Sequence, residues 1–267
     1  KKYVLCDVWQ SLDNYRDKAN VDNAQQEAIY NQAMSSMNVF RKRGVEIEVC
    51  RNLTVNCAEH YLDQTFDFIY IDARHDFKGV YEDLVKWWPK LKDGGIFAGH
   101  DYVTQSEGPS QNGQDWTKNY DGTVDETGTV VKGAVNKFAT QLGLSVSVGR
   151  KEKSWPSWAI RKPVHSVSAS EDLSQLNHVG GAKLVDAVSS SDRDTQNNVI
   201  PGYQLASNVL GSRPVAIQSD PPPVEFDERY DLGFVLEKEE ATIGAELGVQ
   251  RGVFTTELLK RWKFAKK

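Results

Sequence analysis

The sequence has no long apolar stretch and no concentrated block of basic residues. In 267 residues, no apolar run approaches the roughly 18 that a membrane-spanning helix needs, so no membrane span is expected. No run of about five Lys and Arg residues occurs, and the net charge is -5, so nucleic acid is not an expected partner. The length is sufficient to bury the core of one α/β domain, which we expect to act on a small molecule.

Cysteine is scarce, and its placement matches no familiar pattern. The three residues, Cys6, Cys50 and Cys57, are an odd number without metal-ligand spacing. They are therefore predicted to be reduced residues in or near the core. Reduced cysteines favour an intracellular setting, so a cytoplasmic location is expected.

Apolar, strand-like runs alternate with amphipathic helical segments. Strands are predicted at 3–8, 45–49, 66–71, 96–99, 146–148 and 158–161, and helices at 22–43, 80–91 and 130–142. The strand runs are apolar almost throughout, as is typical of strands covered on both faces. This alternation predicts an α/β fold with a mostly parallel sheet and helices on both faces.

Two long segments lack periodicity. Residues 103–129 are rich in Gly, Ser, Asn, Gln and Asp and are predicted to form a loop. Loops of this length are usually either functional lids or disordered. Residues 165–198 have a linker composition, and three prolines at 221–223 stiffen a later segment. The chain is therefore divided into a core at 1–164, a linker and variable lid segment at 165–229, and a final unit at 230–267.

The final unit contains a glycine turn. The run from Ala241 reads as a buried strand, a Glu246-x-Gly248-x-x-x-Gly252 turn and a helix. Glycines let backbone approach a ligand, and the helix that follows offers free N–H groups. Such a unit usually opens a nucleotide-type α/β domain, whereas here it is the last element. If the two ends are joined, Asp7 follows Gly252 by about 20 residues, the spacing that serves ribose recognition.

The acids near this turn indicate which cofactor is expected. Glu246 and Asp7 would disfavour a polyphosphate, but they would suit a ribose and an amino-acid ammonium group. The pair therefore points away from NAD and towards S-adenosylmethionine. A glycine turn alone is weak evidence, and a purely structural turn stays open as its alternative.

A second group of polar residues follows two neighbouring strands. Asp72 and His75 come after the strand at 66–71, and Asp101 comes after the next strand. Ligands bind at the carboxyl ends of parallel strands, so the two aspartates are expected to share Mg²⁺ or Mn²⁺. His75 would act as a general base near neutral pH. The alternative is that Asp72 caps the next helix and His75 is a solvated loop residue.

The run from Tyr70 to Tyr102, with Ile71-Asp-Ala-Arg-His75 and Gly99-His-Asp101-Tyr, resembles the core of the class I S-adenosylmethionine methyltransferases. It is most similar to the branch that contains the macrocin and mycinamicin sugar O-methyltransferases. The resemblance covers residues 1–102, and residues 130–162 and 230–262 fit the last and first parts of that fold. It implies that Asp7 binds the ribose, that Asp72 and Asp101 bind metal, and that His75 is the catalytic base. The residues implied for the cofactor are Glu246, Gly248, Gly252, Asp7 and Asp72, with adenine near Cys50 to Leu53.

The order of the elements departs from that family. Its first strand and glycine motif stand at the end of this chain, so the Rossmann-like fold is expected to be circularly permuted, with Lys1 and Lys267 close together. Two alternatives to a permutation stay open. The chain could span two units of a tandem protein, with Glu246 completing a neighbouring copy by domain swapping. The order of the residues could also reflect how the chain was assembled and not the order in a natural protein.

The sequence thus predicts an S-adenosylmethionine-dependent O-methyltransferase, assisted by Mg²⁺ or Mn²⁺, that acts on a hydroxyl of a small molecule or sugar. His75, Asp72 and Asp101 are the predicted catalytic residues. One alternative is a metal-independent methyltransferase of the same fold, and another is a cofactor-binding protein without turnover. A homo-oligomer or a domain swap is compatible with either. The sequence does not indicate the acceptor, although Trp116 and Tyr120 in the long loop could stack on a sugar or an aromatic ring.

Overall fold

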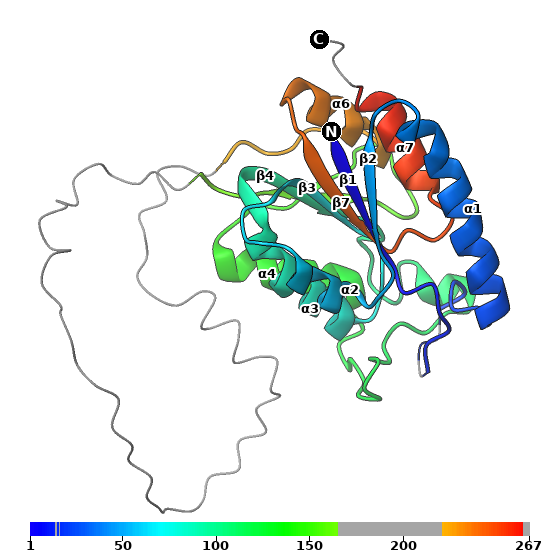
Figure 1. The fold of residues 1–267 in the computed structure, drawn as a ribbon. Helices are drawn as coiled ribbons and strands as arrows, with labels where there is room; N and C mark the ends of the chain where they lie inside the picture. Colours follow the sequence, from blue (N-terminus) through cyan, green and yellow to red (C-terminus); the bar gives the residue numbers. More distant parts are fainter. Residues whose placement is uncertain (14, 16, 165–220, 264–267) are drawn as a thin grey trace, which may run out of the picture. The chain divides into compact units, whose positions relative to one another are not determined.

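The computed structural model of the protein describes residues 1–13, 15, 17–164 and 221–263. These residues belong to a compact unit formed by Lys1–Val164 and Ser219–Lys267. The unit contains a twisted sheet with helices on both faces (Figure 1). The predicted linker at 165–198 and most of the predicted lid segment lie outside the described residues.

The sheet has seven strands in the order β2-β1-β7-β3-β4-β6-β5. Their bounds are β1 Lys2–Cys6, β2 Glu46–Cys50, β3 Phe66–Ile71, β4 Leu91–Gly99, β5 Ser147–Val148, β6 Trp158–Arg161 and β7 Ile243–Leu247. The five strands from β2 to β4 in this order are parallel, and β6 and β5 add an antiparallel edge. The predicted mixed α/β sheet is confirmed.

The last strand along the chain, β7, lies in the middle of the parallel part of the sheet (Figure 1). It pairs with β1 on one side and with β3 on the other, so that Glu246 stands opposite both Leu5 and Tyr70. Four of its five residues are buried, because helices cover both faces at this position. The final unit is therefore an integral part of the core.

Helices form a layer on each face of the sheet. Their bounds are α1 Asn23–Arg41, α2 Thr54–Cys57, α3 Phe77–Trp87, α4 Val130–Leu142, α6 Leu232–Lys238 and α7 Val253–Arg261. α1, α6 and α7 pack together on one face, and α2, α3 and α4 on the other (Figure 1). Asp22 and Asp76 cap α1 and α3 by accepting hydrogen bonds from Gln25 N–H and Gly79 N–H.

The predicted elements are confirmed, with shifts at their ends. The helix predicted at 80–91 begins at Phe77, because Asp76 supplies its cap, and it ends in a 3₁₀ turn at Trp88–Lys90. The strand predicted at 96–99 begins at Leu91, since it runs through the glycine pair at 94–95 instead of starting after it. The short helices α2 and α6 were not predicted, because they span too few residues to show periodicity.

The prediction of three reduced cysteines is wrong for two of them. Cys50 and Cys57 form a disulfide, with their Cα atoms 6.0 Å apart, while Cys6 is free and buried. The turn after β2 folds back into α2 and brings the two residues together, which their spacing alone did not indicate. The basis for a cytoplasmic location is thereby removed. Among the described residues, no helix combines the length and apolarity that crossing a membrane requires.

The two ends of the described chain are in contact. Trp262 is fully buried beside Tyr3, with ring centroids 6.0 Å apart, and its Nε1–H donates to Ala241 O. Lys1 Nζ donates to Lys263 O at 2.6 Å. Lys267, which is predicted to lie near Lys1, is outside the described residues.

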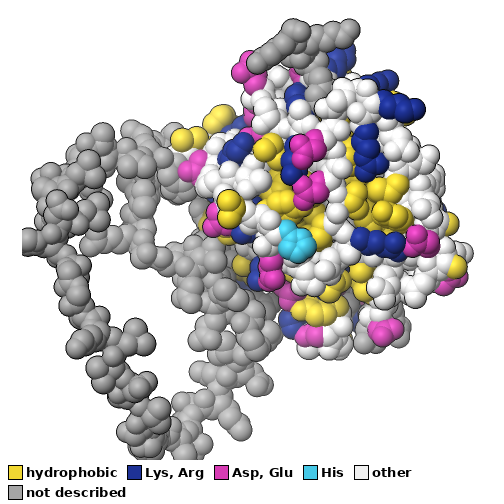
Figure 2. All heavy atoms as spheres, in the orientation of Figure 1, with side chains coloured by type: hydrophobic (Ala, Val, Ile, Leu, Met, Phe, Trp, Pro, Cys, Tyr) yellow, Lys and Arg dark blue, Asp and Glu magenta, His cyan; other side chains and the backbone are white. Residues whose placement is uncertain are grey.

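The space-filling view shows one face of this unit, on which apolar side chains lie among Lys, Arg and acidic residues (Figure 2). Charges of both signs are interspersed there, and no block of a single sign dominates this face. The mixture agrees with the small net charge of -5.

Replacing Trp262 with alanine tests whether the C-terminal unit belongs to the core. Removing this buried ring should lower the free energy of unfolding by about 3–5 kcal/mol. Phe234→Ala is the matched control, because Phe234 is 54% exposed, and it should cost less than about 1 kcal/mol. Urea unfolding of both variants measures the difference. Equal, small losses would show that the final unit is only peripherally attached.

Candidate active site

Acidic residues follow four adjacent parallel strands at one edge of the sheet. Asp7 follows β1, Glu246 lies near the end of β7, Asp72 follows β3, and Asp101 lies just beyond β4. Ile71 of β3 stands opposite Gly99 of β4, so the last two acids leave neighbouring strand ends, as the sequence predicted. The carboxyl edge of the sheet thus gathers residues that are up to 239 positions apart, from Asp7 to Glu246.

The glycine turn fits between the ends of β1 and β3. Gly248 has φ +83°, and its N–H donates to Cys6 O at 2.8 Å. A Cβ atom at this position would lie 1.9 Å from the carbonyl oxygen of Asp72, so only glycine allows the two backbones to approach this closely. Gly252, with φ +71°, immediately precedes α7. The predicted turn is therefore a point of close backbone contact as well as a potential ligand loop.

Asp7 fastens the glycine turn to the end of β1. Its Oδ2 accepts hydrogen bonds from the N–H groups of Val249 and Gln250 at 2.8 and 2.9 Å, and its Oδ1 accepts from Trp9 N–H at 2.9 Å. Burial raises the pKa of Asp7, and these backbone bonds oppose that effect. Asp7 lines the smaller cavity, and its carboxylate already has a structural role. The sequence did not indicate that role.

Glu246 is a buried acid with a strongly raised pKa. It is 1% exposed, and its Oε2 accepts hydrogen bonds from Thr255 Oγ1 at 2.5 Å and Tyr3 OH at 3.3 Å. Burial, reinforced by the charges of Asp72 and Asp7, raises the pKa of Glu246 to about 8. The carboxyl is therefore mostly protonated at neutral pH when no cation faces it.

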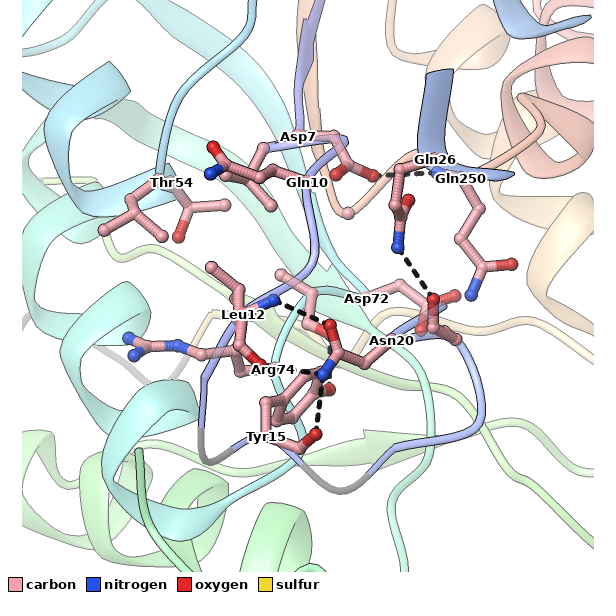
Figure 3. Close-up of a pocket in the computed structure, with 15 residues that line it drawn as sticks. Asp7, Gln10, Leu12, Tyr15, Asn20, Gln26, Thr54, Asp72, Arg74 and Gln250 are labelled. Atoms are coloured by element: carbon pink, nitrogen blue, oxygen red, sulfur yellow. Dashed lines mark hydrogen bonds between the residues drawn. The ribbon is translucent and has the colours of Figure 1, made fainter. Parts of the chain in front are cut away.

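Two cavities meet beside these acids. The smaller, about 80 Å³, is lined by residues that include Asp7, Leu12, Tyr15, Leu53, Thr54 and Gly248 (Figure 3). The larger, about 470 Å³, is lined by residues that include His75, Asp101, Trp116, Trp155, Arg229 and Glu246. Asp72 and Gly248 line both cavities, so the two spaces share a wall at the glycine turn. Leu53 is the residue of the predicted adenine region that reaches the smaller cavity.

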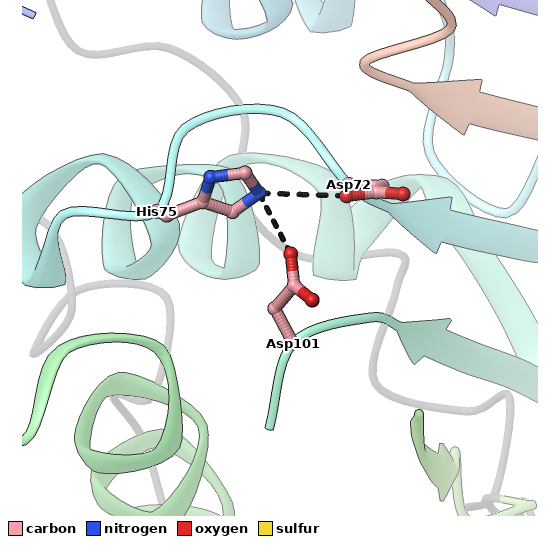
Figure 4. Close-up of side chains that lie close together, drawn as sticks. All are labelled: Asp72, His75 and Asp101. Atoms are coloured by element: carbon pink, nitrogen blue, oxygen red, sulfur yellow. Dashed lines mark hydrogen bonds and ion pairs between the residues drawn. The ribbon is translucent and has the colours of Figure 1, made fainter. Parts of the chain in front are cut away.

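Asp72, His75 and Asp101 point toward one another (Figure 4). His75 Nε2 lies 3.4 Å from Asp72 Oδ1 and 3.2 Å from Asp101 Oδ2, and one ligand atom of each residue falls within 4.8 Å of the others. Asp101 has φ +55°, a left-handed conformation that is uncommon outside glycine and recurs at functional sites. The three predicted catalytic residues are thus brought together.

The acids hold His75 in its charged form. Burial alone would lower the pKa of His75, but hydrogen bonds with Asp17 and Asp72 and the charge of Asp101 outweigh it and raise the pKa well above the ordinary value. Burial alone would likewise raise the pKa of Asp72, and the hydrogen bond with His75 and the charge of His100 lower it. In the absence of another cation, the imidazolium balances the negative charge at this point.

The alternative roles of Asp72 and His75, as helix cap and solvated loop residue, are wrong. The residue that caps α3 is Asp76, so Asp72 is not a helix cap and faces the cavities instead. His75 is 9% exposed rather than solvated. The two aromatic residues of the long loop also differ in position. Trp116 stacks on His75 with centroids 4.3 Å apart, whereas Tyr120 lies under Arg74, away from the site.

Sequence reasoning missed several residues at this site. They are Tyr15, Asp17 and His100, together with Arg229 from the predicted lid segment. Asp17 Oδ2 lies 3.0 Å from His75 Nδ1, and His100 Nδ1 lies 2.9 Å from Asp101 Oδ1. Arg229 Nη1 lies 3.9 Å from Asp72 Oδ2. Asp17 stands in an irregular segment without apolar periodicity, so no pattern distinguished it.

Residues 1–102 match a family model described as "Methyltransferase domain". This match supports the predicted enzyme class, an S-adenosylmethionine-dependent methyltransferase. It covers the part of the chain that contains Asp7, Asp72, His75 and Asp101, and it does not extend to the glycine turn. No curated protein matches the chain.

Solved structures with methyltransferase descriptions are among those similar to the chain. An O-methyltransferase family protein from Burkholderia thailandensis has a TM-score of 0.38 and 11% identity, over 62% of this chain and 52% of that one. A SAM-dependent methyltransferase from Archaeoglobus fulgidus has a TM-score of 0.35 and 9% identity, over 60% of this chain and 86% of that one. A protein from Corynebacterium glutamicum has a TM-score of 0.37 and 10% identity, over 61% of this chain and 62% of that one. This chain therefore spans about three fifths of the length of that protein. Likenesses this distant carry no information about substrate.

The raised pKa of Glu246 predicts a pH effect on stability. The folded carboxyl keeps its proton up to about pH 8, while the unfolded one loses it near its ordinary value of 4.5. The folded state thus binds more protons between these values, so the contribution of Glu246 to stability falls as pH rises, by about 1.4 kcal/mol per pH unit at most. Relative to wild type, Glu246→Gln should gain stability between pH 5 and pH 8, as measured by urea unfolding. The exposed Glu225→Gln is the control, and a pH-independent difference for Glu246→Gln would contradict the assignment.

Proposed function

We propose that the protein is an S-adenosylmethionine-dependent O-methyltransferase that uses a divalent cation and His75. The observation that carries this proposal is the meeting of Asp72, His75 and Asp101 in a cavity whose wall is the glycine turn. A base and a group of carboxylates then lie beside the place expected for the cofactor. The proposed acceptor is a hydroxyl of a sugar or another small molecule, by resemblance to the macrocin and mycinamicin branch.

The charges at the site fit this cofactor. S-adenosylmethionine carries a sulfonium and an ammonium group, and the edge of the sheet presents Glu246, Asp7 and Asp72. Both hydrogen bonds that Glu246 accepts are on Oε2, which leaves Oε1 to receive an ammonium group. A cation there would favour the ionised form of Glu246, which burial otherwise disfavours. Leu53 offers an apolar surface in the smaller cavity, where adenine would lie.

The donor set at Asp72 and Asp101 fits a hard divalent cation. Carboxylate oxygens are the ligands that Mg²⁺ and Mn²⁺ prefer, and the two groups come from adjacent strand ends. His75 Nε2 lies within the same 4.8 Å cluster, so it is available either as a third ligand or as the base. When bound, such a cation would lower the pKa of an acceptor hydroxyl.

The side chains of the protein would supply position and proton transfer. His75 Nε2 faces the space between Asp72 and Asp101. A cation held by these two acids would replace the charge of the imidazolium, and the neutral His75 could then take the proton of an acceptor hydroxyl. Trp116 covers one face of the ring and so excludes water from it. Holding the acceptor oxygen against the cofactor methyl group would account for much of the rate.

We also propose that the chain is a circular permutation of the class I methyltransferase fold. The position of β7 between β1 and β3 supports this, because a family-ordered chain would place its first strand there. The contact between Lys1 and Lys263 supports it as well, since the permuted ends of one fold should be close. Glu246 also lines the larger cavity together with Asp72, His75 and Asp101 of the same chain, which a single permuted copy requires.

Substitutions at His75 and Asp101 test the catalytic proposal. Transfer of a labelled methyl group from S-adenosylmethionine to a panel of sugar and phenol hydroxyls should fall by about 10²–10⁴-fold in His75→Ala. Asp101→Asn and addition of EDTA should each reduce it strongly. The exposed His60→Ala is the matched control and should retain activity. Full activity in both site variants would exclude this mechanism but leave the fold intact, and insensitivity to EDTA would favour the metal-independent alternative.

Moving the chain ends tests the permutation. A reordered chain, with residues 165–267 placed before residues 1–164, retains every residue and restores the family order. It should fold to a monomer with a free energy of unfolding within about 1 kcal/mol of the original, because the same contacts form. It should also bind S-adenosylhomocysteine equally well. A dimeric original chain that becomes monomeric on reordering would instead support a domain swap between units.

A further inference from the structure

The segment between β1 and α1, described at residues 8–13, 15 and 17–22, lines one side of the smaller cavity and is called here the cover segment. Its shape is held by Asn20, whose Oδ1 accepts from Leu12 N–H at 2.8 Å and whose Nδ2 donates to Leu12 O and Tyr15 O at 2.8 and 2.7 Å. Gln26 of α1 donates to Ala19 O at 2.9 Å and fixes the far end of the segment. These bonds join residues in the wall of the smaller cavity, beside the proposed cofactor site (Figure 3).

Two residues of the cover segment reach the proposed base. Asp17 Oδ2 lies 3.0 Å from His75 Nδ1, and the side chain of Asp17 is only 6% exposed. Tyr15 OH lies 3.4 Å from the same nitrogen and 3.3 Å from Ala73 O. Trp116 stacks on the imidazole ring. The ring is therefore fixed at its Nδ1 edge and against one face, while its Nε2 edge is directed at Asp72 and Asp101.

We propose that Asp17 is the positioning residue for His75, an inference that rests on the proposed role of His75 in methyl transfer. The hydrogen bond from His75 Nδ1–H to Asp17 fixes the orientation of the ring and the tautomer in which the Nε2 lone pair faces the reaction space. When Nε2 takes the proton of the acceptor hydroxyl, the new imidazolium is stabilised by the Asp17 carboxylate. The proton stays on His75, and the hydroxyl oxygen forms its bond to the methyl carbon as the bond from carbon to sulfonium breaks.

Asp17 faces a different cavity from several residues of the cover segment, which allows its effect on His75 to be tested separately. Leu12, Ala19 and Asn20 of the cover segment line the smaller cavity, whereas Asp17 lines only the larger one. Asn20 and Gln26 hold the loop through four side-chain bonds that do not involve Asp17. The Asp17 carboxylate adds one local bond, because its Oδ1 accepts from Ala19 N–H at 2.6 Å while its Oδ2 faces His75. Asp17→Ala removes both contacts, whereas Asp17→Asn keeps an acceptor oxygen, so the two variants together separate the effect on His75 from an effect on the loop.

Nuclear magnetic resonance of the full chain tests this without a known acceptor. With ¹⁵N-labelled histidine, S-adenosylhomocysteine and Mg²⁺, the wild type should show a downfield, slowly exchanging Nδ1–H proton that His75→Ala removes. Asp17→Ala should lose this resonance, and Asp17→Asn, which keeps an acceptor oxygen, should retain it in weakened form. Asp13→Ala is the matched control, since Asp13 is an exposed carboxylate of the same segment, and it should match wild type. The affinity for S-adenosylhomocysteine, measured by calorimetry, should stay close to that of the wild type in Asp17→Ala, Asp17→Asn and Asp13→Ala.

Kinetics with the best acceptor from the hydroxyl panel supply the second test. Asp17→Ala should lower kcat by about 10- to 100-fold with little change in KM, and Asp17→Asn should restore part of the loss. Adding Asp17→Ala to His75→Ala should cost nothing further, whereas a general structural defect would add its own loss. Wild-type kcat and an unchanged resonance in Asp17→Ala, or a parallel loss of cofactor affinity, would overturn the inference. If no acceptor is methylated yet the resonance depends on Asp17, the positioning stands and the proposed reaction fails.

Discussion

The pairing of β7 between β1 and β3 is the contact on which the candidate site depends. It places the glycine turn between two strand ends, where Gly248 approaches the backbone of Asp72 so closely that no side chain fits. The N–H groups after Gly248 then find their acceptor in Asp7. Without β7 the sheet would lose its centre, and the acids of β1 and β3 would belong to separate edges. The order of elements along the chain matters less than this arrangement in space.

The arrangement concentrates negative charge. Glu246, Asp7, Asp72 and Asp101 line the two adjoining cavities, and burial makes each ionised form costly unless a cation or a donor faces it. The cost is reduced differently at each acid. Backbone N–H groups donate hydrogen bonds to Asp7, and the imidazolium of His75 stabilises the charge of Asp72. Glu246 has a raised pKa and stays mostly neutral. A site built in this manner is complementary to cationic ligands, which is the property that a sulfonium cofactor and a divalent cation share.

The sequence predicted those parts of the site that follow from strand ends. In a parallel sheet, an acid that follows an apolar strand lies at the carboxyl edge of the sheet. Asp72 and Asp101 follow neighbouring strands, so they could be placed beside each other from the sequence. The glycine spacing likewise located the turn around Gly248. Disulfide formation between Cys50 and Cys57 was missed, because it depends on how the turn after β2 folds back and not on the residue types. The residue types also left Asp72 open as the cap of α3, although Asp76 supplies that cap.

The partners of His75 and Asp72 that come from segments between the strands could not be predicted, for a different reason. Asp17 and Trp116 stand in loops, and Arg229 begins a 3₁₀ turn. The sequence indicated Trp116 only as a surface for an acceptor, and its contact with His75 depends on how the loop bends over the sheet edge. Strand ends fix the acids to within the register of the sheet, whereas these loops can change without disturbing the core. The structure therefore divides the site into a rigid set of acids and a variable set of partners around His75. The orientation of His75 is set by the second group, so it can be altered by substitutions that leave the fold and its stability nearly unchanged.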